Sequence, residues 1–258
     1  MRDDTLRITD VTERAFTFLH LSVTFKVQNG ERTDEKMKAK KVLFIGVGLI
    51  AAFILWTVLI MNVDVQNVGQ SGTAVGFAAF NTGFHQITGV NMPLYTVTDW
   101  LGLVPIAVCF CFGILGLVQL IRRRSLFRVD PDILLLGAYY ILVILGYLIF
   151  EMIPINYRPI LIDGFSEASY PSSTTLLVLS VMPTLILQIK RRCRSRAARM
   201  TVYALAAAFS AFMVIGRLIS GVHWATDIIG SILLSFGLFA LYQAAVLFTD
   251  KRKSNGIQ

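Results

Sequence analysis

Six long apolar stretches, separated by shorter polar segments, dominate the pattern of the chain. A helix needs about 20 apolar residues to cross the hydrocarbon core of a bilayer, because each residue adds only about 1.5 Å. The stretches are Val42 to Val63, Leu101 to Ile121, Ile133 to Phe150, Ser172 to Ile189, Met200 to Ile219 and Ala225 to Phe248. None of them alternates apolar and polar residues as barrel strands do. The pattern predicts an all-α, polytopic membrane protein built as a six-transmembrane-helix bundle.

The first 36 residues differ from the rest, since they hold 13 charged residues against 27 in the following 222. We interpret residues 1–41 as a cytoplasmic tail, residues 42–248 as the membrane domain and residues 249–258 as a second cytoplasmic tail. Met37 opens a basic and then apolar run, MKAKKVLFIG. An alternative interpretation is therefore that residues 1–36 come from an upstream start codon.

Composition agrees with a membrane protein. Hydrophobic residues make up 55% of the chain and charged residues 16%, where soluble domains carry about 25% charged residues. Mean hydropathy is +0.65. These values argue against a soluble, disordered or nucleic-acid-binding chain. Three cysteines without paired spacing argue against disulfide scaffolds and zinc modules. No cluster of carboxylates or Cys/His has ligand spacing, so we expect no metal and no cofactor.

The basic residues predict the orientation of the helices. Of the 24 lysines and arginines, 22 lie in the N-terminal 41 residues, Ile121 to Asp132, Lys190 to Met200 and the C-terminal tail. A six-span threading puts all four segments on one side, which the positive-inside rule assigns to the cytoplasm. Arg158 and Arg217 remain, on the extracytoplasmic side. One such arginine alone would suggest a headgroup contact, but two, each beside other polar residues, favour a site.

A polar segment joins the fifth and sixth spans. Ser220 and Gly221 form a natural helix break. His223 and Asp227 are four residues apart at the predicted start of the sixth helix, so they share a face and can hydrogen-bond. A His partner would offset the cost of a carboxylate within the membrane, and the pairing leaves one imidazole nitrogen free as a base or nucleophile. The alternative is a helix-end hydrogen bond without chemistry.

The starts and ends of the third and fourth spans add phosphate-binding groups. The fourth span begins with SYPSSTT at positions 169–175. A proline followed by hydroxyls indicates a helix N-terminus, whose free N–H groups can bind phosphate, although Ser and Thr begin many helices. Arg158 follows the third span, and the planar fork of arginine suits oxyanions. These segments together predict a phosphate site on one side of the membrane.

The same residues resemble the type 2 phosphatidic acid phosphatase (PAP2) and haloperoxidase superfamily, and in particular its membrane lipid phosphatase branch with six helices. The family pattern is K-x6-R-P, then P-S-G-H, then S-R-x5-H-x3-D. Here the motifs read Glu151-x6-Arg158-Pro159, Pro171-Ser172-Ser173-Thr174 and Gly216-Arg217-x5-His223-x3-Asp227. The third motif is the most specific, since its Arg, His and Asp spacings all match. The resemblance covers Val42 to Phe248.

The resemblance implies roles for these residues. His223 would be the nucleophile that forms a phosphohistidine, with Asp227 as its orienting partner. The phosphate would be bound by Arg158, Arg217, Ser172 and Ser173. The implied partner is a phosphorylated lipid in the bilayer.

Three departures from the family pattern bear on the activity. Glu151 replaces the family lysine, so a cationic phosphate contact is lost and a carboxylate there would repel the substrate. Gly216 replaces a serine. Thr174 replaces the histidine that protonates the leaving group, and a threonine hydroxyl is not an acid near neutral pH.

The missing acid favours one kind of substrate. Cleavage of a phosphomonoester expels an alkoxide, which needs a proton, whereas cleavage of a pyrophosphate expels a phosphate monoester that leaves largely unaided. We therefore hypothesise hydrolysis of a lipid pyrophosphate, such as undecaprenyl pyrophosphate, on the extracytoplasmic face. The alternatives are slow catalysis, or an impaired relative that binds or helps move phosphorylated lipids.

Other polar and aromatic residues of the outer segments are harder to assign. His85, in the loop from Asp64 to Trp100, is the only other histidine on that side, and an ordinary loop histidine is the simpler interpretation. Asp163 and Glu167 are interpreted as solvated loop charges. An interfacial lid is a further hypothesis for the aromatic residues of the outer loop, Phe77, Phe80, Phe84, Tyr95 and Trp100.

Overall fold

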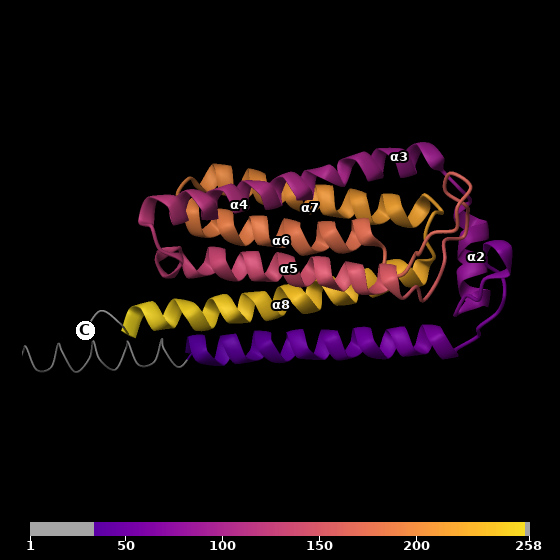
Figure 1. The fold of residues 1–258 in the computed structure, drawn as a ribbon, viewed down its shortest axis with the longest axis horizontal. Coiled ribbons are helices and arrows are strands. Elements are labelled where there is room, and N and C mark those ends of the chain that lie inside the picture. The colour runs from indigo at the N-terminus through magenta and orange to yellow at the C-terminus, as the bar shows by residue number, and fades with distance from the viewer. Residues whose placement is uncertain (1–33, 256–258) are drawn as a thin grey trace, which may run out of the picture.

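The computed structural model describes residues 34–255, which form a bundle of long helices (Figure 1). The helices are the first helix Asp34–Asn62, α2 Ala78–Thr88, α3 Met92–Leu101, α4 Leu103–Arg123, α5 Pro131–Met152, α6 Ser173–Arg192, α7 Arg196–Ile219 and α8 Ala225–Asn255. Six segments are long and apolar enough to span a membrane, because α3 and α4 run on as one segment, Met92–Arg123. The predicted all-α, six-span architecture is confirmed.

The predicted tails fall partly outside the described residues. Residues 1–33, including His20, and residues 256–258 lie beyond them. Within the predicted N-terminal tail, residues 34–41 are described and belong to the first helix.

Helix α6 lies at the centre of the bundle, where it contacts α4, α5, α7 and α8. The first helix lies along α8 at the edge of the bundle (Figure 1). The outer surface carries large exposed apolar side chains on several helices, such as Phe44, Phe110 and Leu205. Such a surface is suited to contact with lipid and not with water. The chain is thus an integral, multi-pass membrane protein.

The two ends of the bundle differ. At one end, which we call the basic end, short connections join α4 to α5 and α6 to α7. There Arg191 of α6 contacts Asp132 of α5 at 3.2 Å and Asp250 of α8 at 2.7 Å, while Arg192 contacts Asp132 at 2.8 Å. These ion pairs join three helices. The other end, the loop end, carries residues 63–91, 153–172 and 220–224, with α2 lying across it (Figure 1).

The segment between α5 and α6 folds back on itself as a narrow hairpin. Asp163 and Gly164 both have positive φ, of 48° and 83°, as two-residue hairpin turns require. Backbone hydrogen bonds join Ile162 and Phe165 on either side of the turn. Farther from the turn, the backbone N–H of Arg158 donates to the carbonyl of Glu167 at 3.0 Å. The turn therefore places these two side chains together.

Candidate active site

His223 lies in the turn between α7 and α8, which begins at the predicted break: α7 ends at Ile219 and Gly221 has a φ of 71°. The imidazole is buried, and its Nδ1 lies 3.1 Å from the carbonyl oxygen of Ser169. A carbonyl can only accept a hydrogen bond, so Nδ1 carries the proton and donates it. Nε2 then holds the free lone pair, and this buried atom has no partner among the described residues.

Burial also keeps this imidazole neutral. Removal from water disfavours the charged form, and it lowers the pKa of His223 to about 4. Near neutral pH the ring is therefore uncharged, with a free lone pair on Nε2. That is the state a nucleophilic histidine requires.

Asp227 hydrogen-bonds to the backbone of the turn, whereas the sequence predicted a hydrogen bond to the His223 imidazole. Helix α8 begins at Ala225, so His223 precedes the helix and does not share its face. The distance from His223 Nδ1 to Asp227 Oδ2 is 3.7 Å, which is longer than a hydrogen bond. Asp227 instead accepts from the N–H of Trp224 at 2.9 Å and from the Asn156 amide at 3.3 Å. The carboxylate thus fixes the backbone next to His223.

His85 fixes the same turn from α2. Its Nε2 donates to the carbonyl of Gly221 at 3.0 Å, and its ring lies 5.7 Å from that of Trp224. Trp224 in turn donates to the carbonyl of Tyr157 at 2.8 Å. His85 therefore contacts the turn that carries His223, and it does not line the cavity described below.

Arg158 and Arg217 both lie close to the same aromatic ring. Their guanidinium carbons are 5.8 Å and 4.9 Å from the ring centre of Tyr95 on α3. Each arginine contacts one exposed carboxylate at 3.1 Å, from Arg158 to Glu167 and from Arg217 to Asp99. Both arginines are otherwise buried, with 8% and 1% of their surface exposed.

Each guanidinium has spare hydrogen-bond donors. The Nε and Nη1 atoms of Arg158 and of Arg217 are buried, and none of them has a partner among the described residues. Buried donors without partners are costly and uncommon in folded proteins. A tetrahedral oxyanion offers acceptors that would satisfy them, since arginine donates readily to such groups.

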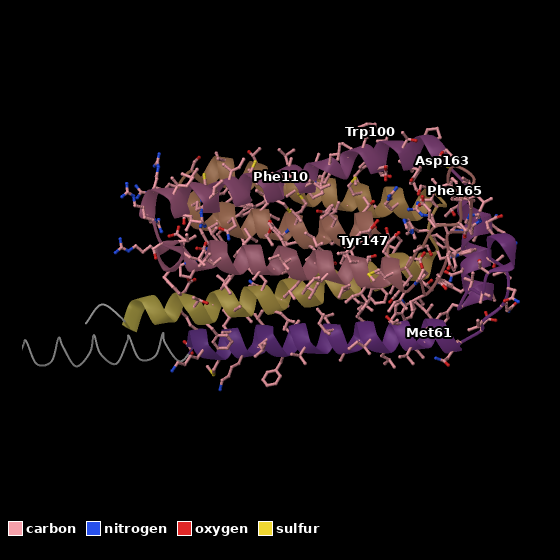
Figure 2. All side chains as sticks on the ribbon, in the orientation of Figure 1. Met61, Trp100, Phe110, Tyr147, Asp163 and Phe165 are labelled. Carbon is pink, nitrogen blue, oxygen red and sulfur yellow. The ribbon has the colours of Figure 1, made fainter. Side chains whose placement is uncertain are left out.

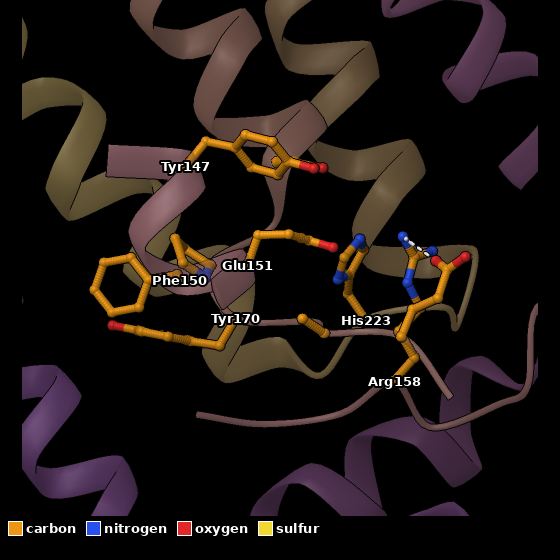
Figure 3. Close-up of a pocket in the computed structure, with 10 residues that line it drawn as sticks. Tyr147, Phe150, Glu151, Arg158, Tyr170 and His223 are labelled. Atoms are coloured by element: carbon orange, nitrogen blue, oxygen red, sulfur yellow. Dashed lines mark ion pairs between the residues drawn. The ribbon is translucent and has the colours of Figure 1, made fainter. Parts of the chain in front are cut away.

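His223 and Arg158 line a common cavity of about 200 Å³ at the loop end (Figure 3). Its walls come from the last turns of α5, the hairpin, the start of α6 and the α7–α8 turn. They consist of Tyr147, Phe150, Glu151, Arg158, Glu167, Ala168, Tyr170, Pro171, Ser173 and His223. In Figure 3 the carboxylate of Glu151 points toward the imidazole of His223. The cavity therefore joins a free imidazole nitrogen, a guanidinium and two carboxylates.

The serine and threonine residues predicted to bind phosphate at the start of α6 have different surroundings. Ser173 lines the cavity. Ser172 is fully buried, and its hydroxyl donates to the hydroxyl of Thr175 at 3.1 Å, away from the cavity wall. Thr174 accepts a hydrogen bond from Nη2 of Arg217.

A second, apolar cavity of about 700 Å³ adjoins the first. It lies between α4, α5 and α6, with walls that include Ile106, Phe110, Val143, Ile144 and Leu177. Two residues, Tyr147 and Ser173, line both cavities. An apolar groove thus leads from the polar cavity along the helices.

Several residues at this site were not singled out for it by sequence reasoning. Glu167, interpreted as a solvated loop charge, pairs with Arg158, and Asp99 pairs with Arg217. Among the outer-loop aromatic residues, Tyr95 contacts the arginines, whereas Phe77 stacks on Trp56 of the first helix at 5.2 Å. An acidic residue next to an apolar span, as at Asp99, was the one available signal.

Comparisons with known proteins agree with the fold and the motifs. Residues 131–250 match the family model described as the PAP2 superfamily, and this segment contains all three motifs. The chain is similar in structure to a transmembrane PAP2 type phosphatidylglycerolphosphate phosphatase from Bacillus subtilis, with a TM-score of 0.58 and 18% identity. That similarity covers 81% of this chain and 97% of the other. Among curated proteins, none matches the sequence.

Proposed function

Because this chain belongs to the PAP2 superfamily, we propose that it is a membrane phosphatase that hydrolyses a lipid phosphate or, in preference, a lipid pyrophosphate. The observation that carries the proposal is the unpartnered Nε2 of His223 in a cavity beside Arg158, whose Nε and Nη1 are also without partners among the described residues. A nucleophile and an oxyanion site thus lie side by side, as phosphoryl transfer requires.

In the proposed reaction Nε2 of His223 attacks the phosphorus atom and forms a phosphohistidine. The proton on Nδ1 stays on the ring and forms a hydrogen bond to the Ser169 carbonyl. This bond orients the imidazole and stabilises the positive charge that develops on it. Arg158, Arg217 and the start of α6 bind the equatorial oxygens, with Ser173 as the serine that lines the cavity. Water then hydrolyses the phosphohistidine and releases phosphate.

The neighbouring apolar groove supports a lipid as the substrate. It starts at the polar cavity and is walled by apolar side chains of α4, α5 and α6. A phosphate headgroup in the first cavity would leave its hydrocarbon chain next to the second. Burial of that chain contributes about 0.8 kcal/mol per methylene group.

The residues around the cavity support the preference for pyrophosphate, such as polyprenyl pyrophosphate. Thr174, at the position of the family acid, is hydrogen-bonded to Arg217. His223 is the one histidine among the residues that line the cavity. A leaving group that departs without a proton is therefore favoured over an alkoxide.

The proposed site of action is the extracytoplasmic face. The cavity lies at the loop end, and the segments 122–128 and 190–199, which carry ten basic residues, lie at the basic end. Since the positive-inside rule places such segments in the cytoplasm, the cavity faces the opposite side, and the C-terminal end of α8 lies in the cytoplasm.

The test is phosphate release by the purified full-length chain in lipid nanodiscs. The substrates are a polyprenyl monophosphate and the pyrophosphate of the same chain length. We expect turnover of both, with the pyrophosphate faster, and loss of about 1,000-fold or more in His223→Gln. Asp163→Asn, a change at the exposed hairpin tip, serves as the control with unchanged rates.

The other outcomes have definite meanings. Faster turnover of the monophosphate would contradict the preference for pyrophosphate. Equal lipid binding by wild type and His223→Gln, with no hydrolysis by either, would contradict the phosphatase and identify a relative that binds phosphorylated lipids.

A further inference from the structure

Hydrolysis of the monophosphate, the slower of the two proposed reactions, needs a group that gives a proton to the leaving oxygen, and both reactions need a group that later takes a proton from water. The titratable side chains of the cavity are Tyr147, Glu151, Arg158, Glu167, Tyr170 and His223. His223 is the nucleophile of the proposed function, and Arg158 keeps its proton at all relevant pH values. Tyr170 is engaged with the hydroxyl of Thr57 at 2.7 Å. A phenol such as that of Tyr147 is too weak an acid to supply the base near neutral pH, so the two carboxyl groups remain.

The two carboxyl groups differ in their contacts. Glu167 lies 3.1 Å from the guanidinium of Arg158 and forms an ion pair with it. Glu151 makes no ion pair within the described part of the chain, and it is exposed at the end of α5. Its carboxylate points toward the imidazole of His223 (Figure 3). Glu151 is therefore open to outside water and directed into the cavity that holds the nucleophile.

A phosphate dianion and a carboxylate in a cavity of about 200 Å³ repel each other. A proton held between the two groups removes this repulsion, and it is also the proton that the leaving oxygen needs.

We propose that Glu151 is the general acid and base of this site, in the place of the missing histidine. The inference rests on the proposed function. It also explains why a carboxylate stands where the PAP2 pattern has a lysine. Proton transfer to the leaving group would then come from a residue of α5, whereas in the family pattern it comes from a histidine at the start of α6.

When Nε2 of His223 bonds to phosphorus, the bond from phosphorus to the leaving oxygen breaks, and the Glu151 carboxyl gives its proton to that oxygen. Water then attacks the phosphohistidine. Its proton passes to the Glu151 carboxylate as the bond between phosphorus and nitrogen breaks. The sum is one ester or anhydride and one water converted to an alcohol or phosphate monoester and inorganic phosphate.

The test compares leaving groups in Glu151→Gln, using the full-length chain in nanodiscs. The three substrates are polyprenyl monophosphate, polyprenyl pyrophosphate and p-nitrophenyl phosphate, whose leaving group needs no proton. We expect kcat/KM for the monophosphate, which reports the phosphorylation step, to fall by about 100-fold to 10,000-fold, in the range of general acid catalysis. The kcat/KM values for the pyrophosphate and p-nitrophenyl phosphate should fall by less than a tenth of that factor, whereas the shared dephosphorylation step should lower kcat for all three.

Two further variants separate proton transfer from charge. Glu151→Lys restores the family residue, and it should lower monophosphate turnover as Glu151→Gln does. If Glu151 only repelled the substrate, Glu151→Lys would instead raise turnover. Glu167→Gln should change KM, through Arg158, without the dependence on leaving group. Asp163→Asn remains the control for loss of a nearby carboxylate.

The outcomes distinguish this inference from the proposed function. If wild type hydrolyses both lipids, His223→Gln is inactive and Glu151→Gln equals wild type on all three substrates, the Glu151 role is wrong and the phosphatase stands. An equal loss of kcat/KM on all three substrates also contradicts it. If wild type hydrolyses none of them, the proposed function itself fails.

Discussion

Gly216 occupies a position at which the PAP2 pattern has a serine, and its surroundings explain the exchange. A Cβ atom at this position would lie 2.7 Å from Cγ2 of Thr98 on α3. Thr98 is fully buried, and its hydroxyl bonds to the carbonyls of Leu94 and Tyr95. The glycine lets α3 approach α7 closely, which brings Tyr95 against the two arginines.

Restoring the family serine should therefore be harmful. Gly216→Ser forces Thr98 to move, and overpacking of this kind costs about 1–3 kcal/mol. We expect a lower thermal midpoint and weaker phosphate binding. Thr98→Ser removes Cγ2 and keeps the hydroxyl, so the double variant should regain most of the loss. Gly137→Ser, at a helical glycine with open space, is the matched control, and an equal loss in both single variants would contradict the steric explanation.

Motif spacing predicted which residues lie close together better than it predicted their hydrogen-bond partners. Motif spacing identified Arg158 and His223, and both line the cavity. It paired His223 with Asp227 on the assumption that both lie on one helix face, whereas α8 begins after His223 and the hydrogen bond goes to Ser169. A partner supplied by a backbone carbonyl 54 residues away leaves no mark in side-chain spacing.

Among the elements, the first helix depends on close contact with α8. At Gly46 a Cβ atom would lie 3.0 Å from the backbone nitrogen of Leu241, and at Gly237 it would lie 2.8 Å from Cδ1 of Ile50. Small residues that let helix backbones approach are a common basis of helix association in membranes, where packing replaces the hydrophobic effect. Trp56 adds a hydrogen bond to the carbonyl of Thr226 at 3.1 Å.

Two glycines of the first helix provide a matched pair for this contact. A Cβ atom added at Gly48 would have no other atom of the described residues within 4 Å. Gly48→Ala should leave the thermal midpoint unchanged or raise it slightly, since alanine favours helix by about 1 kcal/mol. Gly46→Ala gains the same helix propensity but pushes the first helix away from α8, so the thermal midpoint of this variant should fall. Unfolding of the two variants in detergent, followed by circular dichroism, measures the difference; equal midpoints would show that the contact is not tight.

At the element scale the six spans were predictable because length and apolarity are local properties. The predicted spans lie within the observed helical segments apart from Val63 and Ser172. The outer segment from Asp64 to Trp100 was taken as a loop, but it forms α2 and most of α3. These helices pack across the end of the bundle, and their short sequences carry no long apolar run to announce them.

In the whole molecule, the cavity with His223 and the cluster of basic residues lie at opposite ends of the helix bundle, and this arrangement links the fold to the proposed function. The cavity lies at the loop end (Figure 3), and the ion pairs of Arg191 and Arg192 lie at the basic end. Figure 2 shows the side chains that extend from both ends of the bundle. A bilayer between the two ends would keep the cavity on one side only.

Labelling of single cysteines tests this orientation. Ser166→Cys in the exposed hairpin reports on the loop end, with the three native cysteines replaced by alanine. Cys193, next to the end of α6, reports on the basic end when Cys109 and Cys111 are replaced. A membrane-impermeant maleimide applied to intact cells should label the first protein, and the second only after lysis. The reverse pattern would place the cavity in the cytoplasm.

The central claim, that His223 carries the phosphoryl group, is tested most directly by trapping the intermediate. The full-length chain, mixed with labelled polyprenyl pyrophosphate and quenched within milliseconds in alkali, is digested and its peptides are analysed by mass spectrometry. The predicted result is one phosphate on His223, stable in alkali and lost in acid, with none in His223→Gln. Turnover by wild type with phosphate on another residue, or undiminished turnover by His223→Gln, would contradict the claim.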